Sequence, residues 1–222
     1  MTACPVLPQS GLYALTPDGN GDTSHLLTRV LGAISGGVVL VQYRDKATNA
    51  ALRKTRALAL VEACHPRGVP LIVNDDVGVA AEVGAAGVHL GRDDVDPRAA
   101  RSLLGAARII GVSCYDSLAL AHDAIAAGAD YVAFGSFYTS ATKPAAVRCP
   151  LDVLRQACQE LTVPVVAIGG ITAENAQPLL AAGASLLAVI GALFDGPDTV
   201  AAARAFAAPF MFSMSRNNRN TP

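Results

Sequence analysis

The stretch LLAAGASLLAVIG (residues 179–191) ends an apolar helix at Gly183 and begins an apolar strand two residues later. The same cadence recurs in AIAAGADYVAFG (124–135) and in EVGAAGVHL (82–90). Glycine at the turn is expected, because it readily takes the left-handed conformation that ends a helix. A helix that feeds directly into a buried strand is the repeating unit of a parallel α/β sheet.

Working outward from these segments, the same alternation covers the chain. The strand candidates are GLYALT from Gly11, VVLVQY from Val38, PLIVN from Pro70, GVHLG from Gly87, RIIGVS from Arg108, DYVAFG from Asp130, VPVVAIG from Val163 and SLLAVIG from Ser185. Segments with helical spacing between them include 52–63, 117–127, 151–161 and 173–182. Buried strands joined by right-handed crossovers predict a single (β/α)8 TIM barrel of the α/β class. A doubly wound open sheet is the alternative.

Length and composition support one large domain. The 222 residues are 52% hydrophobic and only 16% charged, which provides ample material for a core. We assign residues 1–208 to the barrel and predict that residues 209–222, which lack a useful apolar period, form a disordered C-terminal tail. The formal net charge of −1 argues against nucleic-acid or membrane-surface partners. The sequence leaves open whether the chain forms a homo-oligomer.

Cysteine usage and the N-terminus point to a compartment. The five cysteines are odd in number and lack CxxC spacing, which favours reduced, buried thiols over a disulfide framework. The first sixteen residues have neither a basic segment nor a long apolar segment of the kind found in signal peptides. We therefore expect a cytoplasmic protein.

Two strand candidates end in clusters of charge. VVLVQYRDK (38–46) carries Gln42, Arg44 and Lys46, and LIVNDD (71–76) carries Asn74, Asp75 and Asp76. Alternate residues leaving a strand point to the same side, so the first set can converge on one anion. The carboxylates of the second offer hard oxygens to a divalent cation. Together they predict a metal pyrophosphate site.

In a barrel, active groups lie at the carboxyl ends of the strands, and the remaining polar candidates fall there. These candidates are Asp93 and Asp94 after the fourth strand, Ser113 in the fifth, Tyr138, Thr139, Ser140, Thr142 and Lys143 after the sixth, Gly169 and Gly170 after the seventh, and Ile190 and Gly191 after the eighth. The two adjacent glycines can form turns and also present bare backbone N–H groups to a phosphate.

Several of these residues have simpler interpretations. Arg44 and Lys46 can be solvated, or can pair with Asp45 or Asp75 across the barrel rim, instead of binding a ligand. Asp93 or Asp96 can cap the helix that begins at Pro97, and this role competes with metal binding at Asp94. Ser113 can hydrogen-bond within its own loop. His89 is read as a packed or hydrogen-bonded residue, and Cys114, with no histidine base following it, as structural.

Seven motifs in chain order resemble those of the thiamine phosphate synthase family, also called thiamine-phosphate pyrophosphorylase. They are QYRDK (42–46), VNDD (73–76), GVHLGRDD (87–94), GVSCY (111–115), FGSFYTSATK (134–143), AIGGIT (167–172) and VIGALF (189–194). The resemblance covers roughly residues 11 to 206. It implies a transferase of thiamine biosynthesis that condenses hydroxymethylpyrimidine diphosphate with hydroxyethylmethylthiazole phosphate, releases pyrophosphate and uses Mg²⁺.

The resemblance also implies roles for individual residues. Gln42, Arg44, Lys46 and Asn74 would hold the diphosphate, Asp75 and Asp94 the Mg²⁺, Ser113 the pyrimidine side, and Lys143 the leaving pyrophosphate; Ser140, Thr142, Gly170, Ile190 and Gly191 would hold the thiazole phosphate. Arg44, Lys46, Asn74, Ser113 and Lys143 are the candidate catalytic residues. The chain departs from the family pattern with Thr139-Ser140, where Pro-Thr is common, and with Gly191, where serine is frequent.

Two other functions remain possible on the sequence. A related thiazole tautomerase would share the barrel and a phosphate site, but would not need the diphosphate and metal residues that this chain retains. A barrel kept as a ligand-binding or regulatory module would be expected to have lost such residues.

Overall fold

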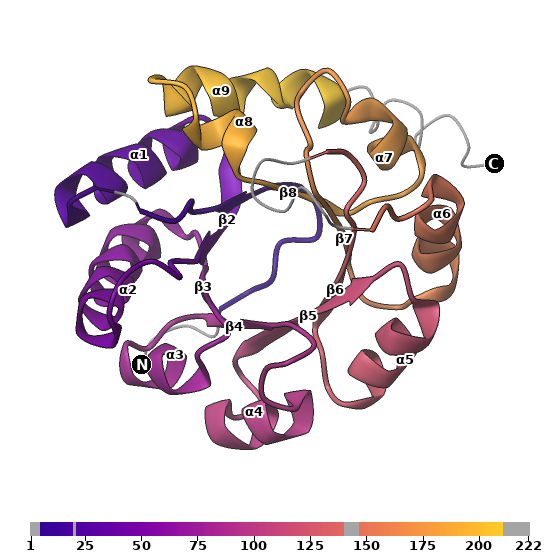
Figure 1. Ribbon diagram of the computed structural model, residues 1–222, viewed down its shortest axis with the longest axis horizontal. Helices are drawn as coiled ribbons and strands as arrows, with labels where there is room; N and C mark the ends of the chain where they lie inside the picture. The colour runs from indigo at the N-terminus through magenta and orange to yellow at the C-terminus, as the bar shows by residue number, and fades with distance from the viewer. Residues whose placement is uncertain (1–4, 20, 140–146, 211–222) are drawn as a thin grey trace.

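A computed structural model describes residues 5–19, 21–139 and 147–210 of the chain. Its parallel strands close into one barrel in the order β1-β2-β3-β4-β5-β6-β7-β8, so each strand pairs with the next along the chain and β8 pairs with β1. Viewed along the barrel, the helices form an outer ring around the strands (Figure 1). The predicted (β/α)8 barrel is confirmed, and the closure between β1 and β8 rules out the open sheet.

The elements alternate as the sequence predicts. The strands are β1 (Gly11–Leu15), β2 (Val38–Tyr43), β3 (Leu71–Asn74), β4 (Gly87–Leu90), β5 (Ile109–Tyr115), β6 (Tyr131–Phe134), β7 (Val165–Ile168) and β8 (Leu186–Val189). The helices are α1 (Thr23–Ser35), α2 (Ala50–Cys64), the short 3₁₀ helix η1 (His65–Arg67), α3 (Val77–Glu82), α4 (Pro97–Leu104), α5 (Leu118–Ala126), α6 (Leu151–Glu160), α7 (Gln177–Ala181), α8 (Gly191–Phe194) and α9 (Thr199–Ala205).

The barrel has two cores because successive side chains of a strand point to opposite faces. The inner cluster fills the barrel and includes Tyr13, Leu40, Ile72 and Tyr131. The larger outer cluster lies between the strands and the ring of helices. Both faces of every strand are therefore covered, which explains why the strands read as continuous apolar runs.

Local sequence signals set most helix ends. Gly84, Gly128 and Gly183 have φ of 67°, 95° and 105°, and each follows the last residues of a helix, as the repeated cadence predicts. One expected helix is shorter than predicted, because α7 begins at Gln177 and not at 173. The Asn175 side chain accepts a hydrogen bond from the Thr172 amide at 2.8 Å and so holds a turn where the helix was expected.

The C-terminal prediction falls mostly outside the described residues, which end at 210. Pro209 is buried, and Phe210 packs against the outer core. Within the described ranges, no helix is both long enough and apolar enough to cross a membrane.

Candidate active site

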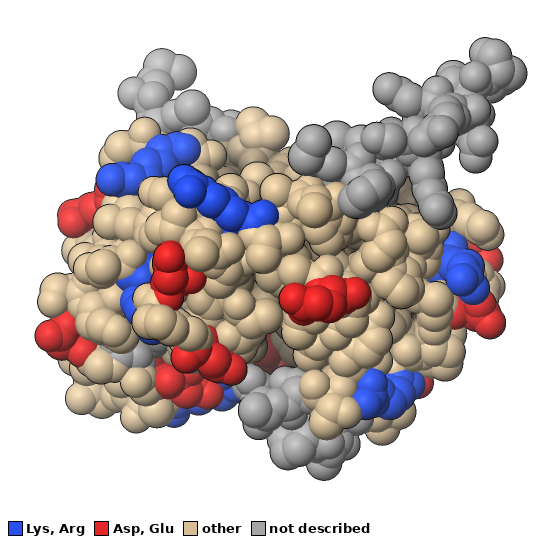
Figure 2. All heavy atoms as spheres, turned by 90° about the horizontal axis from the view of Figure 1, so that it is seen from above, with Lys and Arg blue, Asp and Glu red and all other residues tan. Residues whose placement is uncertain are grey.

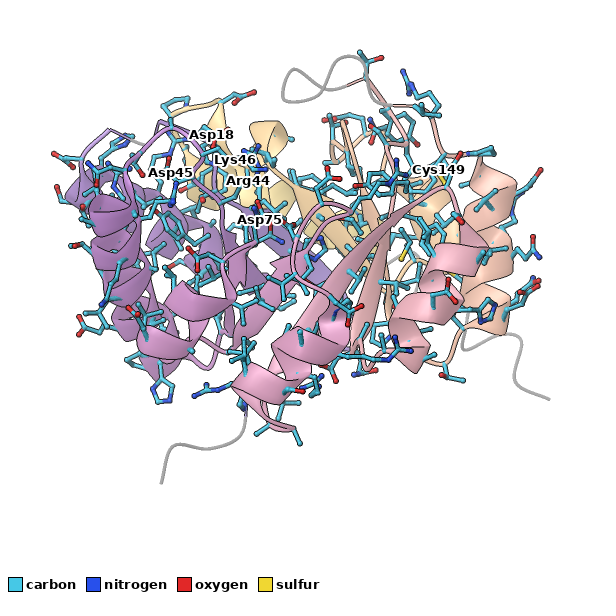
Figure 3. All side chains as sticks on the ribbon, turned by 60° about the horizontal axis from the view of Figure 1, so that its bottom comes forward. Asp18, Arg44, Asp45, Lys46, Asp75 and Cys149 are labelled. Carbon is cyan, nitrogen blue, oxygen red and sulfur yellow. The ribbon has the colours of Figure 1, made fainter. Side chains whose placement is uncertain are left out.

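The end of β2 and the loop after β1 form the basic part of the site. Arg44 Nη1 donates to Asp18 Oδ2 at 2.6 Å, and the Lys46 amide donates to Asp18 Oδ1 at 2.7 Å. Burial raises the pKa of the Asp18 carboxyl, but these two hydrogen bonds and the neighbouring charges bring it below its usual value. In Figure 3, Asp18, Arg44 and Lys46 lie together at one end of the barrel, with Asp75 close by.

A buried ion pair anchors this loop from behind. Asp45 lies between Arg44 and Lys46 in the chain, but its carboxylate turns the other way and contacts Arg56 of α2 at 2.7 Å. The two side chains are 0% and 4% exposed, respectively. Arg56 also donates to the Gly21 carbonyl, so it ties α2 to the loops after both β1 and β2. Neighbouring residues of one loop thus make different contacts: Asp45 anchors the loop to α2, whereas Arg44 and Lys46 contact Asp18.

Two carboxylates meet beside Lys46. Asp75, at the end of β3, has a φ of 65° and is half-buried, and Lys46 Nζ lies 3.1 Å from its Oδ2. Burial raises the pKa of the Asp75 carboxyl, the hydrogen bond shared with Asp94 raises it further, and Lys46 opposes both. Asp94 also accepts a hydrogen bond from the Gly91 amide at 2.6 Å.

These contacts decide two alternatives that the sequence left open. Asp96 accepts the capping hydrogen bond of α4 from the Arg98 amide, so the cap does not require Asp94. Lys46 does pair with Asp75, as the simpler interpretation allowed, whereas Arg44 pairs with Asp18 and not with Asp45 or Asp75.

The carboxylate pair fits Mg²⁺. Two acidic groups that repel as anions are held against each other, and a cation between them would relieve that repulsion. No cluster of three or more histidine, cysteine, aspartate or glutamate side chains suited to a metal occurs among the described residues. Mg²⁺ does not need such a cluster, because it commonly takes one or two carboxylates and completes its shell with water and phosphate oxygens.

Three other predicted site residues, Gln42, Ser113 and Asn74, lie deeper in the barrel than Arg44 and Lys46 or show fewer contacts than they do. Gln42 is 2% exposed and points into the barrel, where its Nε2 donates to the Tyr13 hydroxyl at 2.7 Å. Ser113, on β5, contacts His89 Nε2 at 2.9 Å and not its own loop. Asn74 ends β3 directly before Asp75 and is half-buried. His89 is buried and hydrogen-bonded, as predicted.

The loops after β6 and β7 are joined to each other. The Tyr138 amide donates to the Gly169 carbonyl at 2.9 Å, and the Tyr138 hydroxyl donates to the Asn175 carbonyl at 2.8 Å. Gly169 and Gly170 have φ of 107° and 64°, and a Cβ on Gly170 would lie 2.3 Å from the Thr139 carbonyl oxygen. Only glycine fits both positions, because Ser136, Tyr138 and Thr139 fill the space next to them. Ser140, Thr142 and Lys143 lie outside the described residues.

The rim ends at β8. Ile190 precedes α8 and packs partly against the inner core, and Gly191 is the first residue of that helix. A Cβ added to Gly191 would lie 2.6 Å from Asp195 Oδ2, so a carboxylate occupies the space next to this glycine. The sequence did not identify Asp195, because this residue lies beyond the end of β8. The short helix α8 places its carboxylate next to Gly191.

Cys114 does not belong to the rim. It is fully buried in the outer core, and burial raises the pKa of its thiol to about 12. A thiol in that state is a poor nucleophile at neutral pH, which agrees with the structural interpretation.

The fold and this rim define a (β/α)8 barrel whose polar residues gather on the loops after the strands, the usual location of an active site in this architecture. A sequence model of the family described as thiamine monophosphate synthase matches residues 12–193. The chain belongs to that family.

Individual relatives agree with the family match. The chain is 56% identical to the thiamine-phosphate synthase of Thiobacillus denitrificans over 193 residues, which cover 87% of this chain and 91% of the relative. It is 52% identical to the enzyme of the same name from Aromatoleum aromaticum, with 88% and 94% covered. Among solved structures, a thiamine phosphate pyrophosphorylase from Pyrococcus furiosus superimposes with a TM-score of 0.82 and 30% identity, covering 93% of this chain and 98% of that one.

Proposed function

We propose that this protein condenses hydroxymethylpyrimidine diphosphate with hydroxyethylmethylthiazole phosphate to give thiamine phosphate and pyrophosphate. Its family and its relatives make it a transferase of thiamine biosynthesis with thiamine-phosphate synthase activity. The observation that carries the detailed proposal is the meeting of Lys46 with the carboxylates of Asp75 and Asp94, next to Arg44, which is joined to the same loop through Asp18.

The chemistry requires one bond to break and one to form. The C–O bond between the pyrimidine methylene and the diphosphate breaks, and its electron pair leaves with pyrophosphate. The lone pair of the thiazole nitrogen then forms the new C–N bond, and the ring becomes a positively charged thiazolium. No proton is transferred and no nucleophilic side chain is required, so the protein acts through alignment and electrostatics.

The rim suits a loose transition state of this kind, in which negative charge grows on the departing pyrophosphate. Arg44 and Lys46 supply positive charge there, and Lys143 is proposed to do so from the loop after β6. Asp75 and Asp94 would hold Mg²⁺, which when bound would neutralise part of the diphosphate charge. Asn74 is proposed to complete the diphosphate side, and Ser113 the pyrimidine side.

The thiazole phosphate is proposed to bind on the opposite part of the rim. The loops after β7 and β8 are the habitual phosphate site of these barrels, and the backbone N–H of Gly170 would contribute from a left-handed turn with φ of 64°. Backbone N–H groups at Ile190 and Gly191 would contribute, together with the hydroxyls of Ser140 and Thr142.

We also propose that the reaction takes place in the cytoplasm. Free thiols are typical of reducing compartments, and the structure has free thiols at Cys64, Cys114, Cys149 and Cys158.

Acidic and basic side chains are interspersed on the face seen in Figure 2.

Incubation of the purified protein with both substrates and Mg²⁺ tests the proposal. Thiamine phosphate and pyrophosphate should appear in equal amounts, and omission of either substrate or chelation of the metal should stop their formation. Arg155→Ala, on the exposed face of α6, serves as a control for handling and should react like the wild type. A wild-type protein that makes neither product under these conditions would contradict the proposed function.

A further inference from the structure

A chain of hydrogen bonds crosses the barrel interior below the rim. The Tyr13 hydroxyl receives a hydrogen bond from Gln42 and lies 2.8 Å from the Tyr131 hydroxyl. The Tyr131 hydroxyl lies 2.9 Å from His89 Nδ1, and His89 Nε2 lies 2.9 Å from Ser113 Oγ. Five strands thus contribute one member each, from β2 through β1, β6 and β4 to β5.

If each hydroxyl donates one hydrogen bond within the series, its direction follows from Gln42 Nε2, an N–H group that can only donate. The amide nitrogen Nε2 of Gln42 donates to Tyr13, so the Tyr13 hydrogen passes to the next oxygen, which belongs to Tyr131. In the same direction, the Tyr131 hydroxyl donates to His89 Nδ1, which accepts. A neutral imidazole that accepts at Nδ1 carries its hydrogen on Nε2, and this nitrogen donates to Ser113.

Burial keeps the chain intact at neutral pH. Tyr13 and Tyr131 are 1% and 0% exposed, and burial raises the pKa of both phenols well above the usual value. Each phenol therefore retains the single hydrogen that it passes along the chain.

The backbone leaves room for this arrangement. A Cβ at Gly111 of β5 would lie 1.9 Å from Tyr131 Cζ, so the ring crosses β5 only because residue 111 is glycine. The Tyr131 ring then stacks on His89, with centroids 5.6 Å apart and planes inclined by 24°. Tyr131 is thus held next to His89 by packing as well as by its hydrogen bond.

We propose that Tyr131, oriented by Tyr13, is a positioning residue that holds His89 in its Nε2–H tautomer, so that the Ser113 hydroxyl directs its own hydrogen to an acceptor atom of a bound substrate. His89 and Tyr131 act through Ser113, and only Ser113 reaches the half-buried rim. The hydrogen bond from Ser113 to a substrate rests on the proposed function, with the pyrimidine diphosphate as the acceptor. The Nε2–H tautomer of His89 does not depend on the proposed function.

The tautomer is measured without substrate. Proton–nitrogen correlation spectra of protein labelled with ¹⁵N-histidine distinguish the two tautomers, and the signal lost in His89→Gln identifies His89 among the four histidines. The wild type should show the Nε2–H form of His89. Tyr131→Phe should shift it to a mixture, because Nδ1 loses its donor. Tyr43→Phe removes another buried phenol hydroxyl, which faces Asp45 at 3.4 Å, and should leave the His89 spectrum unchanged.

Steady-state kinetics measure how much the orientation of His89 by Tyr131 contributes to turnover. Tyr131→Phe should lower kcat about five- to tenfold, the effect of one lost hydrogen bond between neutral groups, while the KM for thiazole phosphate changes less than about twofold. If Tyr131→Phe does not fold, Tyr13→Phe provides the same test. Without the Tyr13 hydroxyl, the Tyr131 hydroxyl can either donate to His89 Nδ1 or accept from it, so the Nδ1–H tautomer of His89 should gain population.

An Nδ1–H tautomer in the wild type, or a spectrum unchanged in both variants, would overturn the proposal. A wild type that shows the Nε2–H tautomer but makes no thiamine phosphate would contradict the proposed function and leave the tautomer assignment standing.

Discussion

Replacement of Arg56 by methionine should destabilise the barrel far more than loss of any exposed ion pair. Arg56 contacts Asp45 at 2.7 Å, and the two side chains are 4% and 0% exposed. Methionine keeps much of the side-chain volume but leaves the Asp45 carboxylate buried without its counterion. It also removes the donor to the Gly21 carbonyl. Two backbone amides, of Ala47 and Thr48, still donate to Asp45, but they do not neutralise its charge.

The expected magnitude follows from burial. Removal of one partner of a buried ion pair costs about 3–5 kcal/mol, because it leaves an uncompensated charge in the interior. For a domain of this size, each kcal/mol lowers Tm by about 2–4 °C, so Tm should fall by roughly 6–20 °C. The pair Arg155–Asp152 provides the comparison, since its side chains are 52% and 89% exposed. Such exposed pairs contribute only about 0–1 kcal/mol.

Urea unfolding followed by circular dichroism measures both losses. Arg56→Met should lower the midpoint with an unchanged slope, and Arg155→Met should leave it nearly unchanged. Addition of Asp45→Asn to Arg56→Met should recover part of the loss, because the buried charge is then removed. An Arg56→Met variant as stable as Arg155→Met, or a double variant less stable than Arg56→Met, would refute the reasoning.

Three further substitutions test the site. Asp75→Asn should remove most turnover and leave the unfolding midpoint nearly unchanged, because asparagine tolerates the φ of 65° found here; full activity without metal dependence would end the metal assignment. Lys143→Ala should lower the single-turnover rate more than the affinity for thiazole phosphate, and the reverse would place Lys143 on the other substrate. Gly191→Ser should lower the KM for thiazole phosphate by up to about tenfold, provided the Asp195 carboxylate moves from its position 2.6 Å from the new Cβ; an effect confined to the pyrimidine diphosphate would reverse the placement of the two substrates.

The barrel was predictable because its signals are local. Continuous apolar runs mark strands covered on both faces, and glycine after Ala- and Leu-rich helices marks several of the turns into the next strand. The start of α7 was not predictable from spacing alone. The apolar period of 173–182 suits a helix, but the Asn175 side chain stabilises a turn through contacts with Thr172 and Gly170.

The rim residues were placed by the rule that groups at the carboxyl ends of parallel strands meet, and this rule correctly brings Lys46 to Asp75. It does not predict how deep a residue lies. Gln42 was grouped with Arg44 and Lys46 by alternation, yet it is buried and hydrogen-bonded inside the barrel. Asp18 was missed because its contact with Arg44 joins two loops that are distant in sequence.

The hydrogen-bonded tyrosines were also missed. In strands buried on both faces, hydrophobicity does not distinguish inward from outward residues, so Tyr13 and Tyr131 read as ordinary core positions. Gly111 carried the available signal, since glycine inside a strand often marks the close approach of another group. That signal becomes specific only when the structure places the Tyr131 ring against it.

The central claim is that Arg44, Lys46, Asp75 and Asp94 form one metal pyrophosphate site, and calorimetric titration with pyrophosphate tests it most directly. Pyrophosphate should bind the wild type at least about tenfold more tightly with Mg²⁺ than without it, and Asp75→Asn should lose that difference. Arg155→Ala should retain it, because its side chain lies on the exposed face of α6. Binding of equal strength with and without Mg²⁺, or a metal effect undiminished in Asp75→Asn, would contradict the claim.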